Sequence, residues 1–196
     1  MGRRSDHSRE ELRALFIAQG HALMAEKGLA AFSGREVAKR AGYSVGTIYN
    51  VFGSLDQLIA AINSHTFLIW AEFLRQRLES AGEDRIRALV EGYFEFALEN
   101  PRIWSAIYDH RLAEGEVLGE IEHSHRVELT AIVETEVRAV LPGGGGPETP
   151  RFARSLIATV HGHCSYLVSG SFALLEESDP VGSALDRVRE CLAAQR

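Results

Sequence analysis

The sequence predicts an all-α fold. Apolar residues recur at helical spacing along nearly the whole chain, and no useful stretch shows the two-residue alternation and β-branched enrichment of strands. Hydrophobic residues make up 45% of the 196 residues, which is enough to form a sizeable core. The prolines separate the helical stretches from one another, and they stand at Pro101, Pro142, Pro147, Pro150 and Pro180.

The N-terminal part of the chain predicts one long helix followed by two short ones. Ser8 and Glu11 have the spacing of a capping box, and Gly28 is a good helix stop, so the first helix should cover residues 8–27. The short helices are expected at residues 34–41 and 45–51. Ser54 is then expected to cap a long fourth helix.

The rest of the chain predicts helices up to the C-terminus. They are expected at residues 55–80, 83–99, 102–111, 116–141, 150–175 and 180–194. The glycine run between Pro142 and Pro147 predicts a flexible loop. We therefore expect two domains, a small one over residues 1–53 and a larger helical one over residues 54–196.

The two short helices have the pattern of a helix-turn-helix. Four residues, Ala41 to Ser44, separate them, and a turn of this length that contains glycine lets two helices cross steeply. Gly42 is expected to end the first helix in the left-handed conformation, and Ser44 is expected to cap the second. An ordinary helical hairpin is the alternative on this pattern alone.

The exposed face of the second short helix would carry groups that suit DNA. Thr47 and Tyr49 can bond phosphates, Asn50 can bond an adenine edge, and Gly46 lets the backbone come close. Arg35 would reach a guanine or a phosphate from the preceding helix. In the alternative hairpin, Tyr49 would merely be packed.

The charge distribution supports a basic head on an acidic body. The net charge of the whole chain is −6. Residues 1–52 carry a net charge of +3 and the remaining residues carry −9. Such an asymmetry is typical of a segment that faces nucleic acid, although a surplus of three charges is modest.

This stretch resembles the DNA-binding domain of the TetR (tetracycline-repressor-like) family of bacterial regulators. The resemblance covers about residues 10–62 and is continuous in its spacing. Its matching residues are Ala25-Glu26-Lys27-Gly28, Ser33 with Glu36-Val37-Ala38, the run from Ala41 to Tyr49, Phe52, and the run from Ser54 to Leu58. The His161-Gly162 pair is similar to a subgroup of these regulators.

The resemblance implies a ligand-responsive transcriptional regulator. Such a protein binds an inverted-repeat operator in double-stranded DNA as a homodimer. Its last two helices form the dimer, and a small, largely apolar effector releases the protein from the DNA. Only the resemblance favours repression over activation. The predicted DNA-binding residues are Ser33, Arg35, Ser44, Val45, Gly46, Thr47, Tyr49 and Asn50.

Two positions depart from the family pattern. Val51 stands where the family usually has His, and Leu55 stands where it usually has a phosphate-binding Lys. One or two phosphate contacts are therefore expected to be missing. Affinity is then expected to depend more on Tyr49, Thr47, Arg35 and the basic tail with Arg3 and Arg4. The tail is expected either to follow the minor groove or, without DNA, to be disordered and solvated.

An aromatic and polar set between residues 65 and 130 predicts an effector pocket. A plain core with exposed Tyr and Trp tips is the alternative for each residue. The predicted ligand-binding residues are Phe67, Trp70, Tyr93, Phe96, Trp104, Tyr108 and His110.

Other functions find little support in the sequence. The Gly-x-Ser-x-Gly, His-Glu-x-x-His and Walker A motifs are missing, so no catalytic residue is expected, although a helical-bundle enzyme and a protein-binding adaptor stay open as alternatives. No cofactor or metal is expected. His123 with His125 and His161 with His163 are two residues apart on helices and point to different sides, so neither pair can chelate a metal ion as a unit. A site that takes one His from each pair stays open as an alternative. Cys164 and Cys191 are expected to be free thiols in a cytoplasmic protein, since neither a signal-peptide pattern nor a membrane-spanning stretch of about 20 apolar residues is present.

Overall fold

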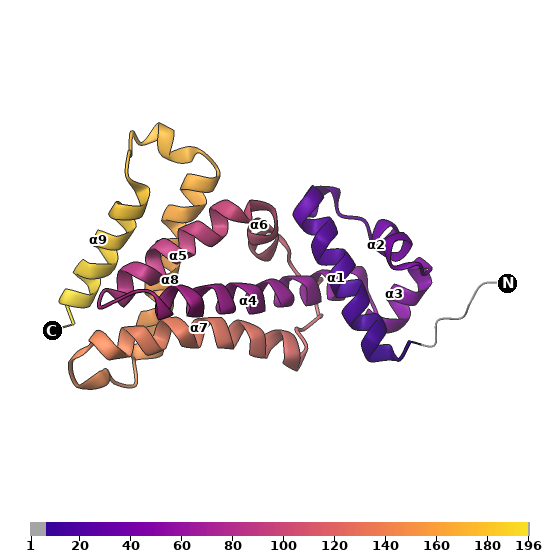
Figure 1. The fold of residues 1–196 in the computed structure, drawn as a ribbon, viewed down its shortest axis with the longest axis horizontal. Coiled ribbons are helices and arrows are strands. Elements are labelled where there is room, and N and C mark those ends of the chain that lie inside the picture. The colour runs from indigo at the N-terminus through magenta and orange to yellow at the C-terminus, as the bar shows by residue number, and fades with distance from the viewer. Residues whose placement is uncertain (1–6, 196) are drawn as a thin grey trace. The chain divides into compact units, whose positions relative to one another are not determined.

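The computed structural model describes residues 7–195, and every regular element in that range is helical. Figure 1 shows the helices in chain order. The all-α prediction is therefore confirmed. The α-helices are α1 (Arg9–Lys27), α2 (Gly34–Ala41), α3 (Val45–Phe52), α4 (Leu55–Glu79), α5 (Arg85–Glu99), α6 (Pro101–Asp109), α7 (Glu120–Val140), α8 (Thr149–Val168) and α9 (Pro180–Ala193), and the short 3-10 turns are η1 (Leu29–Ala31), η2 (Pro142–Gly144) and η3 (Ser171–Leu174).

Side chains cap α1 and α4 as the sequence predicts. The Ser8 hydroxyl accepts a hydrogen bond from the Glu11 amide over 3.2 Å, and the Glu11 carboxylate accepts one from the Ser8 amide over 2.6 Å. These two bonds form the predicted capping box. The Ser54 hydroxyl likewise accepts from the Gln57 amide at the start of α4, over 3.1 Å.

Two helices differ from the prediction by four residues or more at one end. Helix α8 ends at Val168 instead of residue 175, because Gly170 has a left-handed backbone (φ 73°) and η3 follows it. Helix α7 begins at Glu120 instead of residue 116, and the Glu116 side chain accepts hydrogen bonds from Ser54 and Gln57. The predicted loop after Pro142 begins with the 3-10 turn η2.

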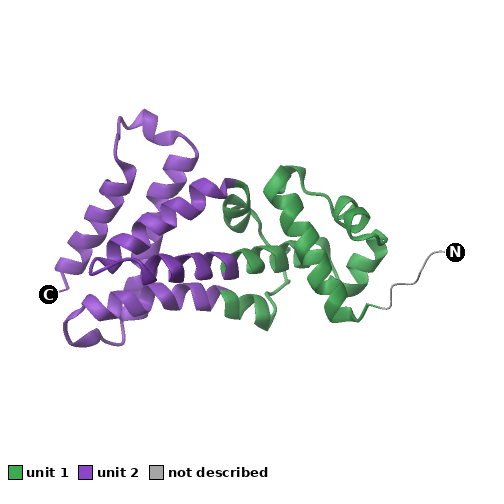
Figure 2. Ribbon diagram, viewed as in Figure 1, with its two compact units in different colours: residues 1–67, 102–125 green, residues 68–101, 126–196 purple. Residues whose placement is uncertain are grey.

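The described residues divide into two compact units (Figure 2). The first combines the residues up to Phe67 with Arg102–His125, and the second combines Leu68–Pro101 with the residues from Arg126 onward. The first unit thus holds the helix-turn-helix segment together with α6 and the first turns of α7. The domain boundary expected between residues 53 and 54 stays a prediction.

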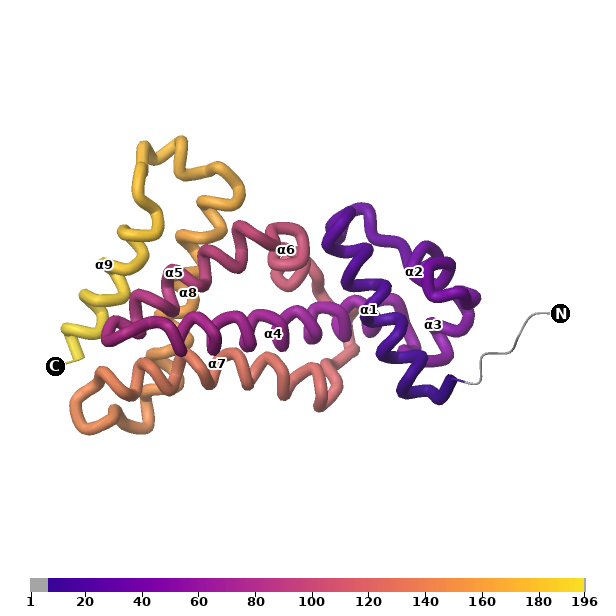
Figure 3. Tube along the Cα trace, viewed as in Figure 1, coloured from indigo at the N-terminus to yellow at the C-terminus, as the bar shows by residue number. Residues whose placement is uncertain are grey.

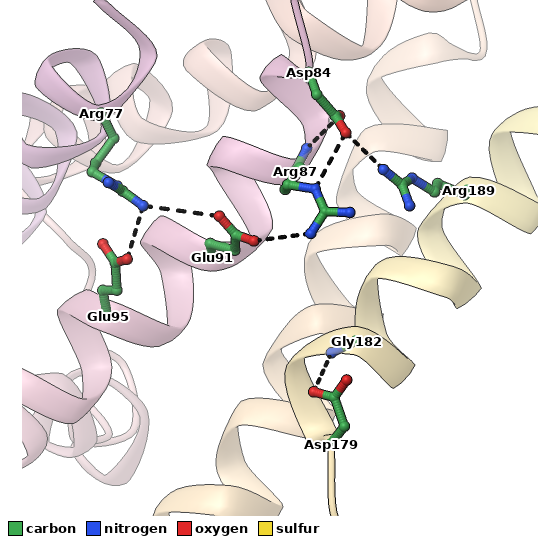
Figure 4. A network of polar contacts seen from close by, with 8 residues as sticks. All are labelled: Arg77, Asp84, Arg87, Glu91, Glu95, Asp179, Gly182 and Arg189. Carbon is green, nitrogen blue, oxygen red and sulfur yellow. Dashed lines mark hydrogen bonds and ion pairs between the residues drawn. The ribbon is translucent and has the colours of Figure 1, made fainter. Parts of the chain in front are cut away.

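The second unit is built around α5, α8 and α9. Helices α8 and α9 form a hairpin that η3 joins, which the chain trace in Figure 3 follows. Trp70 and Phe96 stack at its core with their ring centroids 4.9 Å apart, and both are 1% exposed. Asp84 caps α5 and also pairs with Arg189 of α9 over 2.6 Å (Figure 4). This carboxylate therefore ties the start of α5 to α9.

Candidate nucleic-acid interface

A glycine turn joins α2 to α3. Gly42 adopts the left-handed conformation (φ 79°, ψ 23°) that the sequence predicts for it. Its amide donates to the Lys39 carbonyl over 3.2 Å, and the Tyr43 amide donates to the Ala38 carbonyl over 2.9 Å. These two bonds form a Schellman motif, which ends α2 and redirects the chain into α3.

A small apolar core holds the two short helices on α1. Val37 and Ala38 of α2 and Ile48 of α3 are at most 2% exposed. Phe52 meets Phe16 of α1 edge to face, with ring centroids 6.3 Å apart. This core turns the opposite side of α3 outward.

The outward side of α3 carries the residues that the sequence assigns to DNA. Gly46, Tyr49 and Asn50 are exposed, and Tyr49 keeps 50% of its surface open. Val45 and Thr47 are half-buried. No described residue covers this face, so it can enter a groove of DNA.

The predicted role of Ser44 as a side-chain cap is wrong. Ser44 lies at the N-cap position of α3, but its side chain makes no capping hydrogen bond. The hydroxyl is instead 3.1 Å from the Thr47 hydroxyl, within hydrogen-bond distance. The first amides of α3 are therefore left without a side-chain acceptor from Ser44.

A hollow of about 450 Å³ lies between the N-terminal ends of α2, α3 and α4. Ser33 is the N-cap residue of α2, and its side chain makes no capping hydrogen bond. The amides at a helix N-terminus attract anions, so this hollow suits a phosphate. It brings together four of the predicted DNA-binding residues with four apolar or small ones, namely Ser33, Arg35, Val45 and Tyr49 with Phe32, Gly34, Ile48 and Leu55.

Ion pairs neutralise part of the basic charge near the interface. Lys27 pairs with Glu36 over 2.7 Å, and Arg40 pairs with Glu26 and Glu36 over 2.7 and 2.9 Å. The hydrogen bond from Lys27, followed by the one from Arg40, lowers the pKa of Glu36 below its usual value. These carboxylates stay charged at neutral pH, so Lys27 and Arg40 contribute little to the positive field.

Arg35 and Lys39 are the cations of α2 that remain available. Both are exposed, and neither forms an ion pair with any residue in the range 7–195. They are four residues apart, so they project from the same side of the helix. Sequence reasoning found Arg35 but missed Lys39, although this spacing is visible in the sequence.

The seven predicted ligand-binding residues fall into both compact units. Phe67, Trp104, Tyr108 and His110 belong to the first, and Trp70, Tyr93 and Phe96 belong to the second. Trp104 is 3% exposed and packs 5.1 Å from Tyr108, while His110 Nε2 is 3.3 Å from an Asp56 carboxylate oxygen. Their role in ligand binding stays a prediction.

An apolar cavity of about 40 Å³ lies inside the second unit. Tyr93 is the one predicted ligand residue that lines it, and its hydroxyl is 3.0 Å from His161 Nδ1. Sequence reasoning missed the aliphatic lining, because branched apolar residues on helices look the same whether they border a cavity or a closed core. The aliphatic lining residues are Ile86, Leu89, Val90, Val133, Val137, Leu156, Ile157, Val160 and Val188.

Two family models match this chain. The model described as "Bacterial regulatory proteins, tetR family" matches residues 16–62, and "Tetracyclin repressor-like, C-terminal domain" matches residues 86–189. The second match alone covers more than half of the chain. The chain belongs to the tetR family. The model describes regulatory proteins, so the resemblance to this family of regulators is confirmed.

Similar proteins agree with this assignment. An HTH-type transcriptional repressor of Mycobacterium tuberculosis is 33% identical over an alignment of 100 positions, which covers 46% of this chain and 53% of the relative. The chain thus spans about half the length of the curated relatives it matches.

Solved structures share the tetR-family fold. A protein of unknown function from Rhodococcus sp. RHA1 superposes with a TM-score of 0.71 at 20% identity, covering 99% of both chains. RolR in complex with resorcinol superposes with a TM-score of 0.69 at 19% identity, covering 94% of this chain and 93% of RolR.

The two departures from the tetR-family pattern have structural consequences. Val51 is 9% exposed, and its carbonyl accepts a hydrogen bond from Arg9 over 3.2 Å. Leu55 packs over Gly34, where an added Cβ would lie 2.9 Å from the leucine Cδ1. An apolar side chain therefore borders the hollow between the N-terminal ends of α2, α3 and α4. The predicted tail contacts of Arg3 and Arg4 lie outside the described residues.

Residues 7–195 of this tetR-family chain hold no group of three or more His, Cys, Asp and Glu side chains that could bind a metal ion. Cys164 is buried, which raises the pKa of its thiol to about 12. Cys191 is exposed on α9, and both cysteines are free thiols, as the sequence predicts.

Within residues 7–195, no single helix is long and apolar enough to cross a membrane. Helices α3 and α4 reach such a length and apolar content only when taken together, and they are bent by 73° at their junction.

Proposed function

We propose that this protein is a ligand-responsive transcriptional repressor that binds an inverted-repeat operator as a homodimer. The observation that carries the proposal is the outward face of α3, where Gly46, Tyr49 and Asn50 are exposed. Beside it stand Arg35 and Lys39 of α2, which form no ion pair within residues 7–195. Membership of the tetR family supports regulation, and the name of the Mycobacterium tuberculosis relative supports repression. Such a protein acts in the cytoplasm, where bacterial DNA lies.

The chemistry of the interface supports a division of labour. Arg35, Lys39, the Tyr49 hydroxyl and the α2 N-terminus are donors suited to phosphates, and phosphate contacts fix orientation. Asn50 is suited to an adenine edge, because its amide can donate and accept at once. Gly46 has no side chain, so the backbone of α3 can approach the bases closely at this position.

A dimer is required for specificity because one such headpiece is small. Helix-turn-helix dimers place two recognition helices in successive major grooves, about 34–36 Å apart. The hairpin of α8 and α9 offers the surface for pairing. One face of α8 combines small residues with an exposed Tyr166, and these small residues are Ser155, Ala158, Gly162 and Ser165.

A small, largely apolar effector fits the second unit. The cavity beside Tyr93 is lined almost entirely by aliphatic side chains, and the Tyr93–His161 pair supplies a polar edge. Its volume of about 40 Å³ holds only one or two water-sized groups, so an effector has to enlarge it. RolR holds resorcinol within the same fold, which supports a small ring compound as the effector class.

Selection from random double-stranded DNA tests the proposed function. The full chain is mixed with a random-sequence pool, and the retained fragments are sequenced. We expect an inverted repeat whose half-sites lie about 10 base pairs apart, with binding that weakens steeply as salt rises. A pool that shows no enrichment would contradict operator binding and favour a protein-binding adaptor.

A further inference from the structure

The segment that leads into α7 packs within the same unit as the helix-turn-helix. Two hydrogen bonds to α4 hold α6 and the residue that directly follows it. Asn63 donates to the Ala106 carbonyl over 3.1 Å, and His110 Nε2 is 3.3 Å from Asp56. The position of this segment is therefore fixed relative to the first half of α4.

The same segment also holds the turn between α3 and α4. Gln57 donates from its side-chain amide to the Glu116 carboxylate over 3.1 Å and to the Val117 carbonyl over 3.2 Å. The Ser54 hydroxyl donates to Glu116 over 3.4 Å while it caps α4. Only Gly53 separates Ser54 from the last residue of α3.

A buried ion pair links the start of α7 to α1. Glu122 is 8% exposed, and its carboxylate accepts a hydrogen bond from the Arg13 guanidinium. A carboxylate this deeply buried needs a charged partner, because an unpaired charge is very costly to desolvate. Glu122 therefore restrains the position of Arg13.

Arg13 in turn contacts the end of the recognition helix. Its guanidinium carbon lies 5.0 Å from the centroid of the Phe52 ring, which is the geometry of a cation–π contact. Phe16 meets the same ring edge to face. Phe52, the last residue of α3, is thus held by two side chains of α1.

We propose that Glu122 is a positioning residue for operator recognition, which acts on α3 through Arg13 and Phe52. The inference rests on the proposed function, since it concerns how the recognition helix is presented to DNA. Glu122 orients the guanidinium, the guanidinium holds the Phe52 ring, and the ring fixes the C-terminal end of α3. Without the carboxylate, Arg13 loses its anchor, and the C-terminal end of α3 is held less tightly.

The substitution Glu122→Gln gives a test whose sign separates positioning from simple electrostatics. It removes a negative charge, which on charge alone strengthens binding to any DNA. A misplaced recognition helix loses base contacts but keeps phosphate contacts. We therefore expect affinity for a fragment selected by the wild-type protein to fall about 5- to 150-fold, while affinity for a scrambled fragment is unchanged or higher.

A matched control separates positioning from loss of stability. Glu136 is 7% exposed and pairs with Arg85 over 2.6 Å, but both residues belong to the second unit. Glu136→Gln should lower thermal stability to a comparable extent and leave the ratio of selected to scrambled affinity unchanged. Affinities are expressed per folded dimer, measured by circular dichroism and sedimentation.

A second variant keeps the inference testable if Glu122→Gln fails to fold. Phe52→Leu preserves the ion pair and removes the ring, so it should lower the same affinity ratio. A double variant of Arg13→Gln and Glu122→Gln should lose little more than either single change, because all act through one contact chain. Wild-type binding with no selectivity refutes the proposed function itself. If the wild type binds selectively but Glu122→Gln keeps the same ratio of selected to scrambled affinity, the positioning role alone is overturned. If Glu122→Gln does not fold, an unchanged ratio in Phe52→Leu overturns it instead.

Discussion

The rings of His21 in α1 and His65 in α4 meet edge to face, with their centroids 5.2 Å apart. Within the described residues, the buried Nε2 atom of His21 has no hydrogen-bond partner. Burial, together with the neighbouring His65, lowers the pKa of His21 to about 4. Burial and the nearby His125 also lower the pKa of His65. The unit that carries the helix-turn-helix therefore resists protonation at this contact.

This contact predicts that mild acid destabilises the protein. The unfolded chain binds a proton at His21 near pH 6.5, whereas the folded chain binds it only near pH 4. The contribution of neutral His21 to the free energy of unfolding is therefore fully present above pH 6.5. It is lost progressively as the pH falls toward 4. We expect a loss of about 2 kcal/mol, discounted for partial solvent exposure. Thermal melts of wild type and His21→Phe between pH 7.5 and 4.5 measure it, and equal pH slopes would refute it.

Replacing Arg35 by alanine should weaken DNA binding through lost phosphate attraction. Because Arg35 forms no ion pair with a described residue, its charge is free to displace a counterion. The binding free energy should weaken by about 1 kcal/mol for each headpiece. The slope of log affinity against log salt concentration should shrink by roughly one for each headpiece. Titrations at several salt concentrations measure both quantities.

Arg40→Gln is the matched control for that experiment. Arg40 lies on the same helix, but Glu26 and Glu36 already neutralise it. Its removal should leave the salt slope nearly unchanged. A larger change in slope at Arg40 than at Arg35 would show that the assignment of available charges is wrong.

Gly162→Leu should break the dimer without unfolding the subunit. An added Cβ at Gly162 meets no described atom within 4 Å, and leucine favours a helix over glycine by roughly 1 kcal/mol. Any loss must therefore come from a partner that packs on this face of α8. Analytical ultracentrifugation should show monomers with undiminished helical content, while Ala131→Leu on α7 adds bulk and stays dimeric. A Gly162→Leu dimer of normal strength would contradict pairing through α8.

Asp84→Ala should destabilise the second unit more than the loss of one surface ion pair. Asp84 accepts from the Arg87 amide over 3.1 Å as a helix cap and from Arg189 over 2.6 Å. Loss of a cap costs about 1 kcal/mol, and an exposed ion pair adds at most about as much. Arg189→Ala removes only the ion pair and should cost less in urea melts. Equal costs would mean that the cap contributes nothing.

Local chemistry explains why so much of the fold could be predicted from the sequence. Ser8 with Glu11, Ser54 and Gly42 act through neighbours within five residues, so the ends of α1, α2 and α4 follow from short-range rules. The start of α7 could not be predicted in this way. Glu116 lies before the helix and accepts hydrogen bonds from Ser54 and Gln57, which are about sixty residues away in sequence.

The candidate interface was predictable for the same reason, and the effector side was not. The exposed face of α3 follows from helical spacing once Ile48 is placed inward. A pocket, by contrast, depends on which side chains leave a gap between helices. Trp70 and Phe96 fill their space by stacking on each other, while Leu89 and Val160 border a cavity, and composition does not distinguish the two cases.

The affinity of Tyr49→Ala for a selected operator fragment tests the recognition surface most directly. Tyr49 is half exposed and borders the hollow between α2 and α4, so its loss leaves the core and the α8 face untouched. We predict at least a tenfold loss of affinity, with dimerisation and melting temperature unchanged. A Tyr49→Ala protein that binds the fragment as tightly as wild type would show that α3 does not present this face to DNA.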